Sequence, residues 1–134
     1  MNKHDATFFF PAPTKQKFCT QCGSELSQIV PPEDNQVRDT CLSCGAVHYR
    51  NPLIVVGTIP VYENKVLLCK RAIEPRSNTW TFPAGFMELS ESTAEGAKRE
   101  TVEESGAIVE VGDLFTVIDV PQTNQVHIYY LAKA

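Results

Sequence analysis

Apolar and polar residues alternate with two different periods along the second half of the chain. Glu63 and Asn64 separate two apolar, β-branched runs, and this arrangement is typical of a β-hairpin. Further extended segments follow along the chain. Between the third and the fourth strand lies a stretch whose apolar and polar residues have a different period. The predicted strands cover residues 53–62, 65–72, 80–88, 107–121 and 125–134.

The stretch between the third and fourth of these strands has helical spacing. Ser92 and Glu95 have the spacing of a capping box, and Gly106 stands where a C-terminal cap is expected. We therefore predict a helix over residues 92–105. Val102 is its only large apolar residue, so the segment does not have the pattern of an ordinary amphipathic core helix.

Three like charges lie on one side of this predicted helix. Glu100, Glu103 and Glu104 stand at positions i, i+3 and i+4, where each like-charged pair costs about 0.2–0.5 kcal/mol in an isolated helix. Carboxylate oxygens are ligands that Mg²⁺ prefers, so a divalent cation would relieve this repulsion. Gly96 and Ala97 lie one turn earlier, and we expect them to leave room for a bulky ligand. The alternative is a solvated charged face.

Two C-x-x-C pairs occur in the first half of the chain. Four thiolates can close a tetrahedral zinc site, and a four-cysteine site leaves no open position, so we expect a structural zinc ion. We expect His48 to be a polar edge residue rather than a ligand, and Cys69 to be a small buried residue on a strand. The alternative for this module is a nucleic-acid or partner-binding role. The predicted zinc ligands are Cys19, Cys22, Cys41 and Cys44.

These patterns divide the chain into three parts. Residues 1–17 show no hydrophobic period and are predicted to form a flexible tail. A zinc ribbon is predicted over residues 18–50. Asn51 and Pro52 mark a boundary, because the residue before a proline favours extended geometry. The remaining domain covers residues 51–134.

Composition and charge narrow the function classes. The chain has 134 residues, 43% of them hydrophobic, which suits one domain with its own core and a small stapled module. Its net charge is −4, and it has no basic block, so it is a poor candidate for nucleic-acid binding. No apolar run is long enough to span a membrane, and a secretory signal pattern is absent at the start. We expect a cytoplasmic protein that handles phosphates through metal ions.

The acidic helix and the loop before it match a longer motif, G-x5-E-x7-R-E-x-x-E-E-x-G, which resembles the Nudix box. Thr101 and Ala107 stand where that family usually has an aliphatic residue. The cysteine module and the strands around it extend the resemblance to zinc-ribbon Nudix hydrolases of the ADP-ribose and FAD diphosphatase type, over residues 18–134. The motif is filled by Gly85, Glu91, Arg99, Glu100, Glu103, Glu104 and Gly106.

The resemblance implies an α/β (α+β) fold, namely a Nudix α/β/α sandwich with a mixed sheet, preceded by the small four-cysteine zinc ribbon. The family domain normally continues past the position of Ala134 with another strand and a second large helix. We therefore expect that the C-terminal part of the Nudix fold is missing from this sequence. The alternative is that pairing with another chain, for example in a homodimer, completes the fold.

The resemblance also implies a reaction and roles for the motif. Metal-dependent hydrolysis would cleave the diphosphate linkage of ADP-ribose, FAD or a related dinucleotide into two monophosphates. Glu100, Glu103 and Glu104 would bind the catalytic Mg²⁺ or Mn²⁺. Arg99 would orient one of these glutamates by a salt bridge, and Glu91 would brace the loop and the helix. The general base stays unassigned, because it is a box glutamate in some members and an acid beyond the box in others.

Two alternative functions stay open. One is an NADH diphosphatase, although the substrate motif that such enzymes usually carry after the box is absent. The other is a non-catalytic Nudix module that binds a nucleotide or a protein partner.

Residues around the loop are candidates for substrate contacts. The backbone of Gly85 could approach the acids, while Arg71 and Arg76 could bind phosphates, Arg76 being equally well a solvated loop residue. An aromatic plane could stack on adenine or flavin, with core packing as the alternative. The aromatic candidates are Trp80, Phe82 and Phe86.

Overall fold

A computed structural model describes residues 15–72 and 78–134 of the chain. Arg76 and most of the predicted N-terminal tail therefore lie outside the described residues. The chain divides into two compact units, with the division between Asn51 and Pro52. Each unit is described by itself below.

The first unit is a small antiparallel sheet that carries two cysteine knuckles. Its three strands pair in the order β1-β2-β3. Each knuckle turns at a glycine with positive φ, since Gly23 has a φ of 80° and Gly45 a φ of 81°. Their N–H groups donate to the carbonyl oxygens of Cys19 and Cys41. The strands are β1 (Ser27–Ile29), β2 (Arg38–Thr40) and β3 (Val47–His48).

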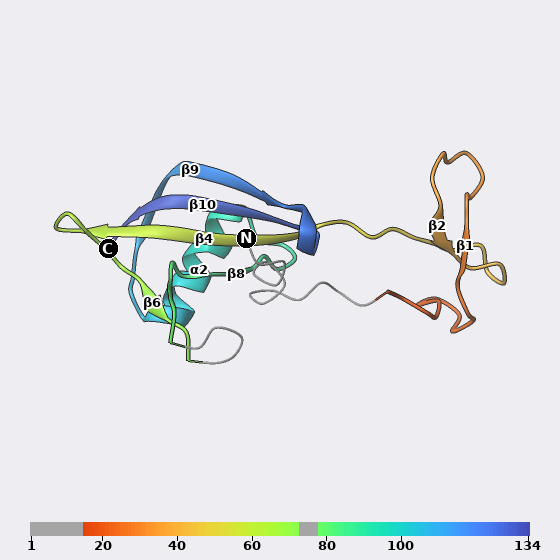
Figure 1. Ribbon diagram of the computed structural model, residues 1–134, viewed down its shortest axis with the longest axis horizontal. Helices are drawn as coiled ribbons and strands as arrows, with labels where there is room; N and C mark the ends of the chain where they lie inside the picture. Colours follow the sequence, from red (N-terminus) through yellow and green to blue (C-terminus); the bar gives the residue numbers. More distant parts are fainter. Residues whose placement is uncertain (1–14, 73–77) are drawn as a thin grey trace. The chain divides into compact units, whose positions relative to one another are not determined.

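The second unit is built on one mixed sheet, as the family resemblance implies, with strand order β5-β4-β10-β9 and β8 also paired to β4 (Figure 1). Strand β4 is parallel to β10 and antiparallel to both β5 and β8. Strands β9 and β10 form an antiparallel pair. The strands of this sheet are β4 (Leu53–Tyr62), β5 (Lys65–Val66), β8 (Ala84–Phe86), β9 (Glu110–Val120) and β10 (Gln125–Lys133).

The predicted hairpin is confirmed, but its second strand is shorter than expected. Glu63 and Asn64 both have positive φ, at 46° and 61°, as a two-residue hairpin turn requires. The prediction of one continuous strand over residues 65–72 is wrong. Strand β5 ends at Val66, and a separate strand β6 (Cys69–Lys70) pairs with β7 (Trp80–Thr81).

Competition for one edge of β4 explains this interruption. Strand β8 pairs with β4 on the edge that β5 uses further along, in the register Gly57↔Ala84. The N–H of Thr58 donates to the carbonyl of Pro83 at 3.1 Å. Because β8 occupies this edge, the chain beyond Leu67 leaves the sheet and pairs elsewhere.

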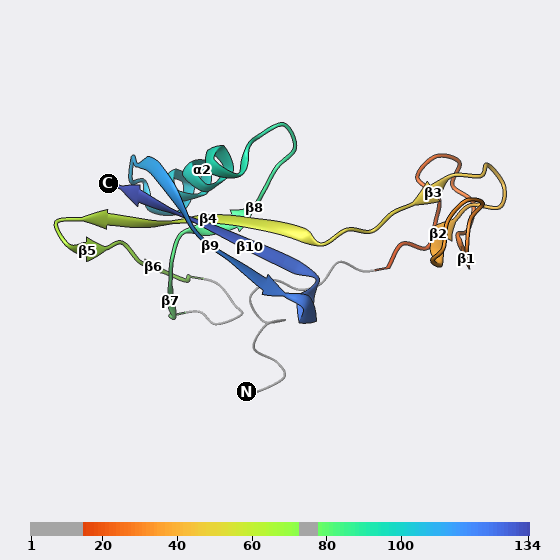
Figure 2. The same ribbon diagram turned by 90° about the horizontal axis from the view of Figure 1, so that it is seen from above.

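The predicted helix is confirmed as α2 (Thr93–Ser105). The Ser92 side chain accepts a hydrogen bond from the N–H of Glu95 at 3.1 Å. Gly106 ends the helix in the left-handed conformation with a φ of 72°, and its N–H donates to the carbonyl of Val102. Figure 2 shows α2 on one side of the sheet formed by β4, β9 and β10.

The small residues of α2 pack against the sheet and do not leave space for a ligand, so that expectation is wrong. Ala97 is fully buried. An added Cβ on Gly96 would lie 2.7 Å from a Glu91 oxygen and 2.9 Å from the Val56 side chain. Gly96 therefore allows a close approach between α2, strand β4 and the preceding loop.

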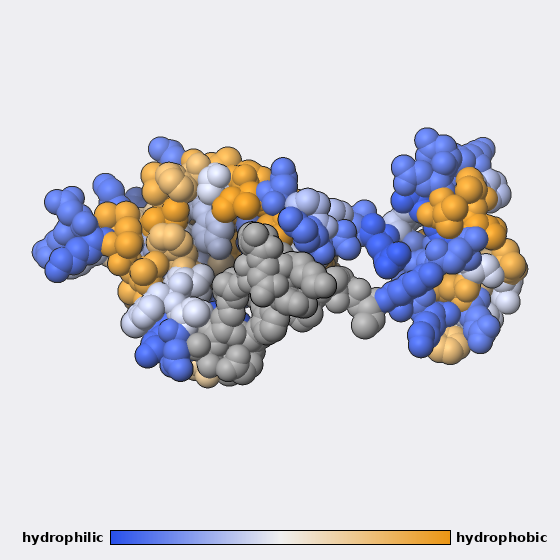
Figure 3. All heavy atoms as spheres, viewed as in Figure 1, coloured by the Kyte–Doolittle hydropathy of each residue, from blue (hydrophilic) through white to orange (hydrophobic). Residues whose placement is uncertain are grey.

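The core lies between α2 and β4, where Val56, Thr58 and Thr101 are fully buried. Within residues 15–72 and 78–134, α2 is the one α-helix, so the second helical layer of the expected sandwich is not part of the described structure. Figure 3 shows hydrophobic residues gathered over β4, β9 and β10 on the face it displays. On β9 the exposed large apolar residues are Leu114, Phe115, Val117 and Ile118. No helix in the described part of the chain is long and apolar enough to cross a membrane.

Candidate functional site

The four predicted zinc ligands converge in the first unit. Their sulfur atoms all lie within 4.8 Å of one another. The Sγ atoms of Cys19 and Cys44 are 3.7 Å apart, and those of Cys22 and Cys41 are 3.5 Å apart. A tetrahedral site with Zn–S bonds of about 2.3 Å has sulfur atoms about 3.8 Å apart, so the cluster has the dimensions of a zinc site.

The electrostatics of this cluster also fit a divalent cation. Burial raises the pKa of the Cys19 thiol, but hydrogen bonds from His48 and from the backbone lower it to about 6. A hydrogen bond with the backbone of Ala46 lowers the pKa of Cys44, but the neighbouring cysteines outweigh it and raise the value to about 12. The cluster therefore resists full ionisation until a cation compensates the thiolate charges.

His48 is not among the converging ligand atoms, but it contacts one of them. Its Nε2 lies 3.4 Å from the Sγ of Cys19. Strand pairing sets this position, because β3 places His48 opposite Asp39 of β2. The sequence-based expectation that His48 is a polar edge residue does not include this contact with Cys19.

The second candidate site centres on Arg99 of α2. Its Nε and Nη2 donate to the two carboxylate oxygens of Glu91, at 2.9 and 2.8 Å. Its Nη1 donates to Glu100 at 2.8 Å and to Glu103 at 3.3 Å. Nη2 also donates to the carbonyl of Phe86 at 3.1 Å. One guanidinium thus links the helix, strand β8 and the loop between them.

Glu91 ties the loop to the helix and is held in its charged form. The N–H of Glu88 donates to its Oε1 at 2.7 Å. The hydrogen bonds from Arg99 and Glu88 lower the pKa of Glu91 to about 2, against a smaller effect of burial. The hydrogen bonds that Arg99 donates to Glu91 and Glu100 raise the pKa of Arg99.

Glu104 lies apart from the contacts of Arg99 and is directed to the start of β8. Its Oε2 accepts a hydrogen bond from the N–H of Ala84 at 3.1 Å. Burial raises the pKa of Glu104, and the charges of Glu100 and Glu103 add to that rise. Arg71, which follows β6 directly, acts in the opposite direction. A cation near these carboxylates would remove the cost of ionising Glu104.

Gly85 lets the backbone of β8 approach the acids, in line with the expectation. An added Cβ would lie 2.3 Å from the carboxylate carbon of Glu100. The three helix glutamates do not converge as the cysteines do, because Arg99 holds two of them and Ala84 the third. The cysteine cluster is the one group of converging metal-ligand atoms in residues 15–72 and 78–134.

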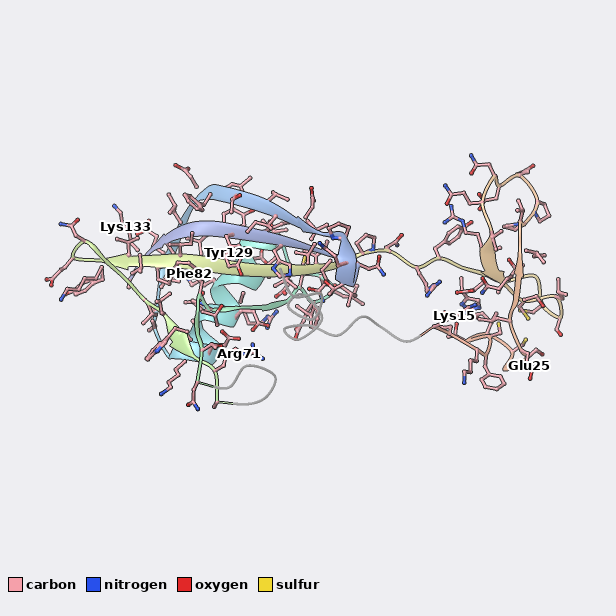
Figure 4. The ribbon with its side chains drawn as sticks, in the orientation of Figure 1. Lys15, Glu25, Arg71, Phe82, Tyr129 and Lys133 are labelled. Carbon is pink, nitrogen blue, oxygen red and sulfur yellow. The ribbon has the colours of Figure 1, made fainter. Side chains whose placement is uncertain are left out.

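The aromatic candidates differ in their surroundings. Phe82 packs edge-on against Tyr129 of β10, with ring centroids 6.4 Å apart, and Figure 4 shows these two residues together. Trp80 is 62% exposed, and the Lys70 ammonium lies 5.8 Å from the centre of its ring. Phe86 is 40% exposed. Trp80 and Phe86 are therefore exposed, whereas Phe82 packs against Tyr129.

Tyr129 is absent from the sequence-based site, although it lies near the acids. Burial raises the pKa of its hydroxyl, and the charge of Glu104 adds to this. Parallel pairing of β10 with β4 places Tyr129 beside Gly57. That pairing joins distant segments and could not be read from the local sequence.

Comparison with known families accounts for nearly all of the described chain. A family described as NUDIX domain matches residues 51–133. A zinc-ribbon family described as Nudix N-terminal matches residues 17–50.

Two curated relatives are similar to parts of this chain. A protein of Methanocaldococcus jannaschii named ADP-ribose pyrophosphatase is 37% identical over 54% of this chain and 43% of its own length. A protein of Haemophilus influenzae named NAD-capped RNA hydrolase NudC is 30% identical over 67% of this chain and 33% of its own length. This chain thus spans less than half the length of the curated relatives that it matches.

The fold has a similar solved structure. A crystal structure of a NUDIX hydrolase from Nitrosomonas europaea has a TM-score of 0.83 and 49% sequence identity. The match covers 88% of this chain and 67% of that one.

Proposed function

This chain belongs to the Nudix hydrolase family, and from that premise we propose that it hydrolyses the diphosphate linkage of a nucleoside diphosphate joined to another moiety. The proposed substrates are ADP-ribose, FAD or a related dinucleotide, and the products are two monophosphates. The observation that carries this proposal is the set of carboxylates on α2, which Arg99 and the Ala84 N–H hold beside the Gly85 backbone.

The proposed holders of the catalytic Mg²⁺ or Mn²⁺ are Glu100, Glu103 and Glu104. Two observations support this set, namely the raised pKa of Glu104 beside two like charges and the glycine that leaves space at Glu100. When bound, a divalent cation polarises a phosphoryl oxygen and neutralises charge on the diphosphate. Hard oxygen ligands such as these suit Mg²⁺ and Mn²⁺ better than zinc.

The chain's own residues provide positioning. The paired hydrogen bonds from Arg99 to Glu91 fix the loop that carries Gly85 against α2. Arg99 also holds Glu100 and Glu103 at the loop side of the helix. A divalent cation held by these two carboxylates would compete with Arg99 for them, while the Glu91 contact would stay in place.

One arginine and two aromatic side chains are the proposed substrate contacts. Arg71 is close enough to Glu104 to lower the pKa of that carboxyl, so its guanidinium is suited to bind a phosphate beside the acids. Phe86 offers a partly exposed ring on β8. Trp80 offers a second ring, whereas Phe82 is engaged with Tyr129.

The zinc ribbon is proposed to be structural. Four sulfur ligands complete a tetrahedron and leave no position for a substrate or water. The zinc ion would supply folding free energy to a unit whose own buried core is small.

A substrate panel tests this proposal. The full chain is incubated with ADP-ribose, FAD, NADH, coenzyme A and modified nucleoside triphosphates, with Mg²⁺, with Mn²⁺ and with a chelator, and products are identified by mass. Metal-dependent release of two monophosphates from ADP-ribose or FAD is the expected result. Absence of turnover for every compound with both metals would favour the non-catalytic binding module.

NADH diphosphatase is the second candidate, and one observation favours it. The relative of Haemophilus influenzae at 30% identity is named an NAD-capped RNA hydrolase. Preferential release of reduced nicotinamide mononucleotide and AMP from NADH in the same panel would select this candidate over the first.

A further inference from the structure

The zinc ribbon has two sides that differ in burial. Cys19 and Cys41 are buried, whereas Cys22 and Cys44 are exposed. Nitrogen atoms also lie near the buried Cys19 sulfur. The backbone N–H of Gln21 donates to it at 3.3 Å, and the Nε2 of His48 lies 3.4 Å from it.

We propose that His48 is a positioning residue of the zinc site, whose Nε2–H donates to the Cys19 thiolate and thereby slows loss of zinc. Four thiolates around one zinc ion carry a net charge of about −2. An N–H group directed at a thiolate takes up part of this charge. Repulsion among the four thiolates is thereby reduced, and the bond between sulfur and zinc is retained longer. This inference does not depend on which substrate the second unit hydrolyses.

The strand that carries His48 is held firmly enough for this role. His48 pairs with Asp39, a residue only 3% exposed. The Asp39 carboxylate in turn accepts a hydrogen bond from the Gln28 amide and forms an ion pair with Arg50 at 3.3 Å. The imidazole is therefore fixed on one side of the cluster by the sheet, not by a flexible loop.

His48 is not proposed as a fifth ligand. The four sulfur atoms already converge at the dimensions of a closed tetrahedral site. The distance of 3.4 Å from Nε2 to sulfur is that of a hydrogen bond to sulfur, so the imidazole contacts a ligand and not the centre of the cluster.

Zinc transfer tests this role without reference to hydrolysis. The zinc-loaded full chain is mixed with excess chromophoric chelator at one fixed pH, and the rate of zinc transfer is recorded. The variants are His48→Ala, His48→Phe and His48→Gln, with Tyr49→Ala as a matched control on the neighbouring, 60% exposed position. Phe keeps a planar ring but has no donor, whereas the Gln amide can donate from a similar place.

We expect zinc transfer about tenfold faster for His48→Ala and His48→Phe, and close to wild type for His48→Gln and Tyr49→Ala. If the Ala variant does not fold, the comparison of Phe with Gln carries the test. Wild-type transfer by His48→Phe would overturn the proposal. Equal acceleration by Phe and Gln would also overturn it, because the effect would then come from packing and not from the donated hydrogen bond.

Discussion

The hydroxyl groups of Thr58 and Thr101 lie 2.6 Å apart in the buried layer between strand β4 and helix α2. Thr101 also donates to the carbonyl of Ala97, one turn earlier in the helix, at 2.7 Å. Its hydrogen is thus used within α2, and Thr58 is the donor of the bond between the two. This pair explains how a polar residue occupies a Nudix-box position that usually holds an aliphatic one.

The Thr58 and Thr101 pair predicts an asymmetric mutational effect. Thr101→Val removes the acceptor for a fully buried donor and should cost about 1–3 kcal/mol of unfolding free energy. Thr58→Val should cost less, because Thr101 still donates to Ala97. The double variant should recover part of the loss, which urea denaturation of all four proteins would measure. Strictly additive losses would show that the two hydroxyls are not coupled.

Removing one carboxylate from the acidic helix should separate activity from stability. Glu103→Gln or Glu104→Gln should lower turnover at least about 100-fold, because a metal ligand is lost. Thermal stability should stay near or above wild type, since a like charge is removed at helical spacing. Glu95→Gln on the same helix is the matched control. Full turnover by either variant would contradict the metal assignment.

Two glycines provide a matched comparison of backbone contacts. An added Cβ on Gly85 would meet the flexible Glu100 carboxylate at 2.3 Å, whereas on Gly57 it would meet the Pro83 carbonyl at 2.5 Å. Gly85→Ala should therefore fold normally and lose activity, because the Glu100 carboxylate is displaced. Gly57→Ala should lose about 1–3 kcal/mol of stability, since backbone must move. Thermal melts with parallel turnover assays measure both effects, and equal losses of stability would contradict this reading.

The Glu91 and Arg99 contact predicts a contribution to stability in acid. The pKa of Glu91 is lowered from 4.5 to about 2 in the folded chain. Its contribution is therefore complete above about pH 4.5 and is lost as the pH falls through about 2. Between about pH 4.5 and pH 2, the stability of the wild-type chain should fall more steeply than that of Glu91→Gln. The midpoints of urea denaturation at each pH measure this difference. Glu88→Gln, at an exposed partner 3.8 Å from Arg99, should behave like wild type.

The cysteine cluster predicts a metal content. Elemental analysis of the purified chain should give one zinc ion per chain, and removal of that ion should unfold residues 18–50. The change is measurable as a loss of dispersed amide resonances from this unit. Cys69→Ser, outside the cluster, should leave the zinc content unchanged. A metal-free chain with an intact ribbon would contradict the four-thiolate site.

Local signals in the sequence predict those parts of the fold that local chemistry determines. The Glu63-Asn64 turn adopts positive φ at both positions, and the Ser92 and Gly106 caps bound α2 as expected. These features depend on residues within a few positions of one another, so a single sequence contains the necessary information.

Features that depend on distant segments are not predictable in this way. The strand expected over residues 65–72 is interrupted because β8 takes the same edge of β4. Gly96 serves close packing on Val56, although its position beside the acids suggested a ligand space. The contact of His48 with Cys19 requires the pairing of β2 with β3. Each of these outcomes is decided by tertiary contacts that no local pattern contains.

The parallel pairing of β4 with β10 has a consequence for synthesis of the protein. Leu53 pairs with Gln125 and Val61 with Lys133, so this partner of β4 leaves the ribosome after the other described strands of the sheet. The hairpin, β8 and α2 can assemble on β4 earlier, because they are closer in sequence. Until then, the edge of β4 that pairs with β10 has no strand beside it and is prone to aggregate. We therefore expect the nascent chain to need chaperone protection until Lys133 has emerged.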